Sequence, residues 1–374
     1  MRYRIEKDAL GEKVIPQESY FGIGTLRAKD AFEITKHGLS RQNIKALAVI
    51  KKVAAKTNYE CGLLDLRVSE AISLSADEIL NGRLHGQFVT DSVQDGYGIG
   101  MNINACEVIA NRANEMLGGE KGTYEYVSVQ DVNMFQDIRE VVVLSGKLTA
   151  IKLAKKMFVE CKKFKASIDA LLERSSLSED DELYDEIKSI GAIFERDAKR
   201  FDKAMNGLLE ICYGANVSLN SKQEKEDYIN CFLKNLNQQA TEKYKLSENR
   251  FVVSRNLDGF MHLSTAAKNL MINLSKCISD LKYLAKMGKV KIPNIYETNI
   301  PSEDYIFDFA KQISFYIVGN DLTISRSVEA GTLEENPYMP IICASLYESL
   351  NLIRRTIRTV REIVIEVMVI KNEA

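Results

Sequence analysis

The sequence predicts an all-α protein built as a bundle of long helices. None of the five prolines falls between residues 17 and 292, so no proline interrupts a helix there. Apolar residues recur in steps of three and four along 263–284 and 346–367, which is the period of helices that pack along one another. A broader apolar face at 187–209 indicates a further amphipathic helix.

Two apolar seams define the helices expected in the second half of the sequence. Both follow the 3.5-residue period of coiled coils, so each helix should pack near-parallel to its neighbours. The second seam runs to residue 367, so we expect the chain to finish in a long helix. The first seam comprises Leu263, Ala267, Leu270, Leu274, Cys277, Leu281 and Leu284, and the second Leu346, Leu350, Ile353, Ile357, Val360, Val364 and Val367.

Loops are expected at three breaks that are rich in turn-forming or charged residues, namely 175–186, 213–227 and 291–304. Before the first break, the stretch 141–157 has Gly146 as its only glycine and contains no proline, which favours a continuous helix. The mid-chain helical face carries Ile187, Ile190, Phe194, Phe201, Met205, Leu208 and Leu209.

The start of the sequence differs from the rest in its glycine cluster QDGYGIGMN and its shorter apolar runs. We therefore predict a small N-terminal domain at 1–125 and a central helical bundle at 126–374, which would carry the oligomer contacts.

Composition excludes several classes of function. Lys plus Arg total 50 against 52 for Asp plus Glu, so no nucleic-acid surface is expected. The seven cysteines are scattered singly, as in a reduced cytoplasmic protein. The charged opening MRYRIEKDALGEK is unlike a signal peptide, and no apolar run is long enough for a membrane span. The sequence holds no phosphate loop, dinucleotide fingerprint or metal-ligand cluster, so we expect no cofactor and no metal.

Several separate stretches resemble aspartate ammonia-lyases of the aspartase/fumarase superfamily, in the family's order. The run RIEKDALGEKVIPQESYFGIGTLRAKDAFEI contains the family's Tyr-x-Gly-Ile-x-Thr-x-Arg-Ala pattern at 20–28, and GRLHGQFVTD, NINACEVIANRANEMLG and FYIVGNDLTISRSVEAGTLEENPYMPI follow. The resemblance implies the long-helix bundle of that family. It also implies ammonia or water elimination from a dicarboxylate, with a loop serine as base and with hydroxyls, amides and a lysine holding the developing dianion. Relatives continue into a small C-terminal domain, which this sequence is expected to lack.

The first family segment, Gln-Gly-Gly-Ala-Gly-Thr-Ser-x-Asn, aligns with 94–102. Its two hydroxyl residues are replaced by Ile99 and Gly100, whereas Asn102 is kept. Asn102 is a candidate ligand-binding residue, or it simply closes a glycine-rich turn. His85 in GRLHGQF, where relatives also carry histidine, is a second candidate, with a structural role as the alternative.

The second segment resembles Pro-Asn-Asp-His-Val-Asn followed by Gln-Ser-Thr-Asn-Asp, but the histidine is missing. The Ser-Thr-Asn triplet has become residues 137–139. An acid at position 137 would repel a dicarboxylate, whereas an arginine at position 139 would attract one. The candidate ligand-binding residues are Asn133, Gln136 and Arg139, and Asp137 or Glu140 could serve as a base if buried.

The last two family elements also differ. The histidine-containing loop should fall near 174–192, where an acidic stretch without histidine is expected to be a surface loop. The flexible serine loop with its lysine and asparagine corresponds to the shorter YETNIPSEDYIFDFAKQ, in which Ser302 is a candidate substitute base or a chance neighbour.

The sequence therefore predicts an aspartase-like protein that is inactive as an aspartase, a pseudoenzyme with a structural, regulatory or partner role. One alternative is a lyase with a rebuilt site that makes or breaks a C–N bond of an aspartate-like substrate. Another is a hetero-oligomer with an intact aspartase paralogue. The apolar seams and the resemblance predict a homotetramer, and a small carboxylate or an amino acid is the candidate ligand.

Overall fold

The computed structural model describes residues 2–371, and its helices form two compact units. Unit 1 comprises Met1–Thr149, Leu209–Leu257 and Ser327–Ala344. Unit 2 comprises Ala150–Leu208, Asp258–Arg326 and Ser345–Ala374. The helices α6 (Ile138–Glu173), α12 (Asp308–Glu329) and α13 (Met339–Val360) each have residues in both units. The boundary expected at residue 125 stays a prediction.

Unit 1 is built around α2 (Arg41–Glu60), which contacts four other helices of the unit. Ser40 caps its N-terminus by accepting a hydrogen bond from the backbone N–H of Asn43. Most of its apolar side chains are buried, and Leu47 and Ile50 are fully buried. The helices in contact with α2 are α3 (Leu66–Leu80), α4 (Ile99–Met116), α5 (Val129–Val132) and α8 (Lys222–Gln239).

The remaining elements of unit 1 are short. The antiparallel hairpin of β1 (Tyr3–Asp8) and β2 (Gly11–Pro16) pairs Tyr3 with Pro16 and Asp8 with Gly11. Two-residue strands β3 (Glu210–Ile211) and β4 (Lys245–Leu246) pair in parallel. The short helices are α1 (Ile23–Ala31), α5 (Val129–Val132), α9 (Arg250–Arg255) and the 3-10 turns η1 (His85–Gln87) and η2 (Gly96–Gly98).

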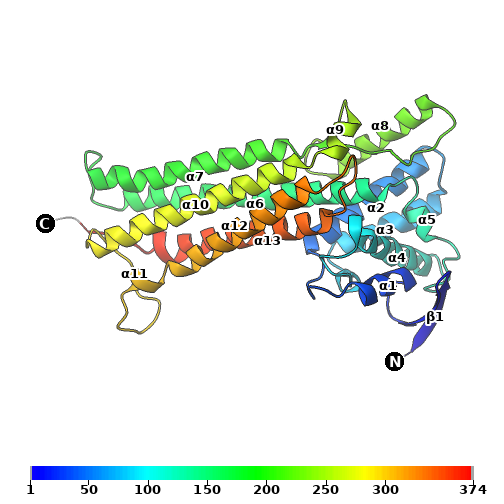
Figure 1. The fold of residues 1–374 in the computed structure, drawn as a ribbon, viewed down its shortest axis with the longest axis horizontal. Helices are drawn as coiled ribbons and strands as arrows, with labels where there is room; N and C mark the ends of the chain where they lie inside the picture. The colour runs from blue at the N-terminus through cyan, green and yellow to red at the C-terminus, as the bar shows by residue number, and fades with distance from the viewer. Residues whose placement is uncertain (1, 372–374) are drawn as a thin grey trace. The chain divides into compact units, whose positions relative to one another are not determined.

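Unit 2 contains long helices that bury the predicted seams. The helices α7 (Glu182–Asn206) and α10 (Asp258–Lys286) contact each other and run side by side (Figure 1). All seven residues of the first seam are buried on α10, which confirms that seam. The predicted continuity of 141–157 is also confirmed, because α6 runs through it without a break.

The prediction for the end of the second seam was wrong. The regular helix stops at Val360, and a π-helical turn, η3, follows at Arg361–Ile365. One extra residue per turn rotates the buried face, so Val364, Ile365 and Met368 are buried whereas Val367 is 43% exposed. The described chain ends in strand β6 (Val369–Ile370), antiparallel to β5 (Val290–Lys291), and not in the expected helix.

Two predicted loops are shorter than expected. In 175–186 the helix α7 already begins at Glu182, and in 213–227 the helix α8 begins at Lys222. The acidic residues in each first turn stabilise the positive end of the helix dipole. The third break, 291–304, begins at the end of β5 and finishes within the short α11 (Ser302–Tyr305).

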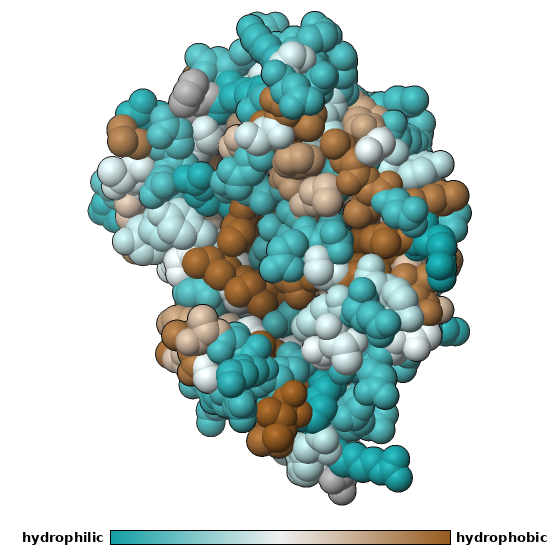
Figure 2. All heavy atoms as spheres, turned by 90° about the vertical axis from the view of Figure 1, so that its right-hand side faces the viewer, coloured by the Kyte–Doolittle hydropathy of each residue, from teal (hydrophilic) through white to brown (hydrophobic). Residues whose placement is uncertain are grey.

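The all-α class is confirmed, and residues 2–371 also form three two-stranded sheets that the sequence analysis did not predict. Among residues 2–371, no helix combines the length and apolar character needed to cross a lipid bilayer. Figure 2 shows one face of the molecule, where apolar side chains reach the surface in patches among hydrophilic ones.

Candidate functional site

A buried lysine connects three of the predicted site residues in unit 1. The ammonium of Lys51 on α2 donates hydrogen bonds to Asn102 Oδ1 at 2.7 Å, Asn133 Oδ1 at 2.8 Å and Gln136 Oε1 at 2.9 Å. Asn102 Nδ2 also donates to Asn133 Oδ1 at 3.1 Å. Asn102, Asn133 and Gln136 therefore form one cluster, which we call the amide cage.

Lys51 itself was missed by the sequence reading. It is fully buried, and burial lowers the pKa of its ammonium. The Cys106 thiol is a further neighbour, and its pKa is raised by burial. The signal was present: Lys51 stands four residues after Leu47 and three before Ala54, on the buried stripe of α2.

The amide cage borders a small cavity of about 280 Å³. Residues of α4 and α5 and the start of α6 line it, and the cage contributes two of them. The lining residues are Asn102, Ile103, Cys106, Val129, Gln130, Asn133 and Ile138.

Asp137 and Arg139 form an ion pair at the start of α6. Arg139 Nε and Nη2 donate to the two Asp137 oxygens at 2.9 and 2.8 Å, and Arg139 Nη1 donates to Glu335 Oε1 at 2.8 Å. Tyr97 Oη donates to the second Glu335 oxygen at 2.7 Å. The guanidinium holds the pKa of Asp137 below its ordinary value, so this carboxylate is a weak base.

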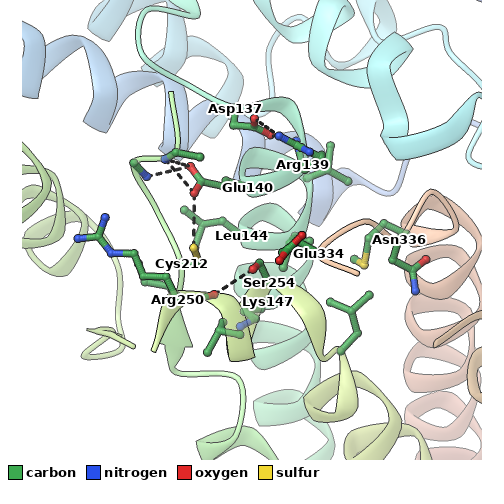
Figure 3. Close-up of a pocket in the computed structure, with 18 of the residues that line it drawn as sticks. Asp137, Arg139, Glu140, Leu144, Lys147, Cys212, Arg250, Ser254, Glu334 and Asn336 are labelled. Atoms are coloured by element: carbon green, nitrogen blue, oxygen red, sulfur yellow. Dashed lines mark hydrogen bonds and ion pairs between the residues drawn. The ribbon is translucent and has the colours of Figure 1, made fainter. Parts of the chain in front are cut away.

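Glu140 lies in the first turn of α6, and its carboxylate is held by backbone groups. It accepts hydrogen bonds from the N–H of Gly214 at 2.8 Å and of Ala215 at 3.1 Å, and from Cys212 Sγ at 3.5 Å. Burial raises the pKa of Glu140 in spite of these bonds, and it raises the pKa of Cys212 to about 12. Figure 3 shows these contacts, with Glu140 pointing toward the 212–215 segment.

The ion pair and Glu140 line the larger cavity of unit 1, which measures about 460 Å³ (Figure 3). Its wall is largely apolar, with Val143, Leu144 and Met339 among the lining residues. Lys147 lines the cavity as well, and its ammonium donates to the carbonyl of Glu210 at 2.6 Å. The other polar lining residues are Tyr97, Cys212, Lys225, Arg250, Ser254, Glu334 and Asn336.

The two remaining candidates, His85 and Ser302, form hydrogen bonds with groups outside the amide cage and the ion pair. His85 in η1 places Nε2 2.9 Å from the carbonyl oxygen of Ile79, at the end of α3. Ser302 belongs to unit 2, where it is buried and donates its hydroxyl proton to the carbonyl of Ile292 at 2.6 Å. Within residues 2–371, no group of three or more His, Cys, Asp or Glu side chains is arranged to hold a metal ion.

Comparison with known proteins decides the family. The chain is 32% identical to the aspartate ammonia-lyase of Bacillus subtilis over 381 residues, covering 96% of this chain and 80% of that protein. This chain belongs to the aspartase/fumarase family. Residues 11–176 match the family model described as Lyase. The aspartate ammonia-lyase of Escherichia coli K12 is 25% identical and is covered to 78% of its length by 94% of this chain.

Solved structures agree with this assignment. A fumarate lyase:delta crystallin from Brucella melitensis in native form superposes with a TM-score of 0.90 at 27% identity, covering 99% of this chain and 89% of that chain. A class II fumarase from Schistosoma mansoni gives a TM-score of 0.87 at 20% identity, over 99% of this chain and 85% of that chain, and shows the shared fold.

Proposed function

We propose that this family member is a non-catalytic subunit with a structural or regulatory role. The observation that carries the proposal is the closed ion pair. Both Asp137 oxygens and one Glu335 oxygen satisfy the Arg139 guanidinium, so the cation expected to attract a dicarboxylate is already neutralised within the chain. A substrate carboxylate would have to displace two protein carboxylates to reach it.

The candidate bases support the same proposal. Asp137 has a lowered pKa, and the Glu140 carboxylate accepts two backbone N–H groups. The Ser302 hydroxyl is held by the carbonyl oxygen of Ile292 at 2.6 Å, and the Glu303 carboxylate lies farther from it, at 3.3 Å. A general base needs a free acceptor aimed at the substrate proton, and none of these three groups offers one. The sequence also departs from the family pattern at all four substrate segments.

The decisive test is fumarate formation from L-aspartate by the pure protein, with an intact aspartase as the control. We expect a rate at least about 10⁴-fold below the control, because one missing base or oxyanion donor alone typically costs 10² to 10⁴. Turnover within about 100-fold of the control would overturn the proposal. Glu140→Gln and Ser302→Ala would then identify the working base.

One observation favours a second candidate function, a lyase of C–N bonds with a rebuilt site. The 460 Å³ cavity is large enough for a small carboxylate or an amino acid, and it contains Glu140 with its raised pKa. A melting-temperature increase with succinate or L-aspartate in the wild type, absent in Glu140→Gln, would favour this candidate. Equal melting temperatures with and without ligand would leave the non-catalytic reading in place.

We also propose that the chain assembles as a homotetramer in the cytoplasm. Exposed apolar residues on α12 support self-association, and the seven free cysteines fit a reducing compartment. If an intact aspartase paralogue is present, it is the alternative partner, and co-expression followed by mass determination of the complex separates the two assemblies.

A further inference from the structure

Two cysteines meet on the surface of unit 1, where α2 ends against α8. Cys61 is the C-cap residue of α2 and is exposed, whereas Cys231 lies on α8 and is half-buried. The two thiols are close enough for each to shift the pKa of the other. Cys231 Sγ also donates to Glu60 Oε2 at 3.2 Å, and Glu60 directly precedes Cys61 in the chain.

The helices are fixed on both sides of this thiol pair. Three residues before Cys231, Tyr228 Oη donates to Asn58 Oδ1 at 2.7 Å. Four residues after it, Asn235 Nδ2 donates to Glu60 Oε2 at 2.9 Å and to Thr57 Oγ1 at 3.2 Å. Tyr228, Asn58 and Asn235 are buried, so these bonds hold the two backbones at a fixed separation. A disulfide needs two backbones already held close, since its geometry tolerates little adjustment.

We propose that Cys61 and Cys231 are a reversible dithiol–disulfide pair, a redox modification site that covalently joins α2 to α8. Cys61 is the attacking thiol because it is the more exposed of the two. The oxidant is a hydroperoxide. Among residues 2–371, Cys61 is the only exposed cysteine.

The chemistry balances with one hydroperoxide for each pair. The Cys61 thiolate attacks the peroxide oxygen, the O–O bond breaks, and Cys61 becomes a sulfenic acid while an alcohol or water leaves. Cys231 then attacks the Cys61 sulfur, its proton passing toward the Glu60 carboxylate. The S–S bond forms, the S–O bond breaks, and the hydroxide leaves as water. Both sulfur atoms are oxidised and the peroxide is reduced.

Burial of the two thiols slows their oxidation. It raises the pKa of the Cys61 thiol, and burial with the nearby Glu60 carboxylate raises that of Cys231 to about 12. Only a small fraction of either thiol is ionised at neutral pH, so oxidation should be slow and should accelerate as the pH rises.

The test is oxidation of the full-length protein with hydrogen peroxide, followed by thiol alkylation in denaturant and peptide mass spectrometry. We expect two of the seven thiols to be lost together, a linked peptide joining Cys61 to Cys231, and full recovery with dithiothreitol. The melting temperature should rise by roughly 5 °C or more on oxidation, because the cross-link closes a long loop in the unfolded chain.

Variants separate the pair from other cysteines. In Cys231→Ser, Cys61 should stop at the sulfenic acid, which a dimedone-type reagent traps, and the melting temperature should no longer rise. Cys212→Ser, which changes a thiol elsewhere in unit 1, should still form the linked peptide. A wild-type protein that keeps all its thiols, or whose linked peptides join other cysteines or other chains, would overturn the proposal.

Discussion

At the scale of single residues, the most telling feature is a buried lysine whose ammonium is hydrogen-bonded to amide oxygens and not to carboxylates. Lys51 is completely buried, and all three protons of its ammonium are donated to side-chain amide oxygens. Burying a charge is costly unless its hydrogen bonds are complete, so Lys51 and the amide cage stabilise each other as a unit.

We expect Lys51→Met to lower the free energy of unfolding by about 2–4 kcal/mol, because Asn102 Oδ1 and Gln136 Oε1 lose the Lys51 donor and Asn133 Oδ1 keeps only the bond from Asn102. Lys52→Met is the matched control on the same helix. Its ammonium pairs with the partly exposed Asp77 at 2.7 Å, and the loss should stay below about 1 kcal/mol. Urea unfolding of both variants measures the difference. A Lys51→Met protein as stable as the wild type would mean that relief of the buried charge outweighs the lost hydrogen bonds.

The Asp137–Arg139 ion pair predicts a pH dependence of stability. The folded-state pKa of Asp137 lies below its ordinary value of 3.8, so the folded state binds fewer protons than the unfolded state. The stabilisation is complete above the unfolded pKa and is lost as the pH falls through the folded pKa. We expect Asp137→Asn to cost about 1–3 kcal/mol at pH 7 and progressively less as the pH falls below 3.8.

Thermal unfolding of the wild type and Asp137→Asn between pH 7 and pH 3 tests this prediction. Glu335→Gln is the control, because its half-exposed carboxylate contacts the same guanidinium and should cost less than about 1 kcal/mol. A difference between wild type and Asp137→Asn that stays constant with pH would contradict the assigned role of the ion pair.

At the scale of elements, periodicity predicted the long helices because the burial of one helical face is a local property of the sequence. It failed at 361–365, since the π turn shifts the buried face by one residue and nothing in the residue types announces that shift. The pairing of β5 with β6 was also beyond a local pattern, because the two strands are far apart in sequence.

In the candidate site, too, the sequence predicted the residues of local motifs but missed the contacts between distant residues. Family segments pointed to Asn102, Asn133 and Gln136, and the structure brings them together around Lys51. Lys51 was overlooked because Lys52 follows it directly, and two adjacent lysines are typical of a solvent-exposed surface. The neutralisation of Arg139 depends on Glu335, which lies almost 200 residues later in the chain, and no spacing rule connects the two.

At the scale of the whole molecule, an exposed apolar face argues for self-association. Ser314, Ile317 and Ile324 on α12 are buried in unit 2. A second face of the same helix remains at the surface, and Phe315 is 73%, Val318 43% and Leu322 59% exposed there. These three residues follow the i, i+3, i+7 spacing of a helical stripe, which we call the α12 stripe. Contiguous apolar stripes on a helix mark contact surfaces between subunits.

We expect the wild-type protein to sediment as a tetramer, and the double variant Phe315→Glu/Leu322→Glu to sediment as a smaller species. Two charges per subunit placed in an apolar contact would have to be buried without partners, which costs several kcal/mol in each interface. Leu10→Glu is the control, because Leu10 is 79% exposed at the turn of the β1–β2 hairpin and should leave the assembly unchanged. Sedimentation-velocity analysis over a range of protein concentrations measures the outcome. A monomeric wild type would remove the basis for a structural role by assembly, and a tetramer in the double variant would place the subunit contact on a face other than the α12 stripe.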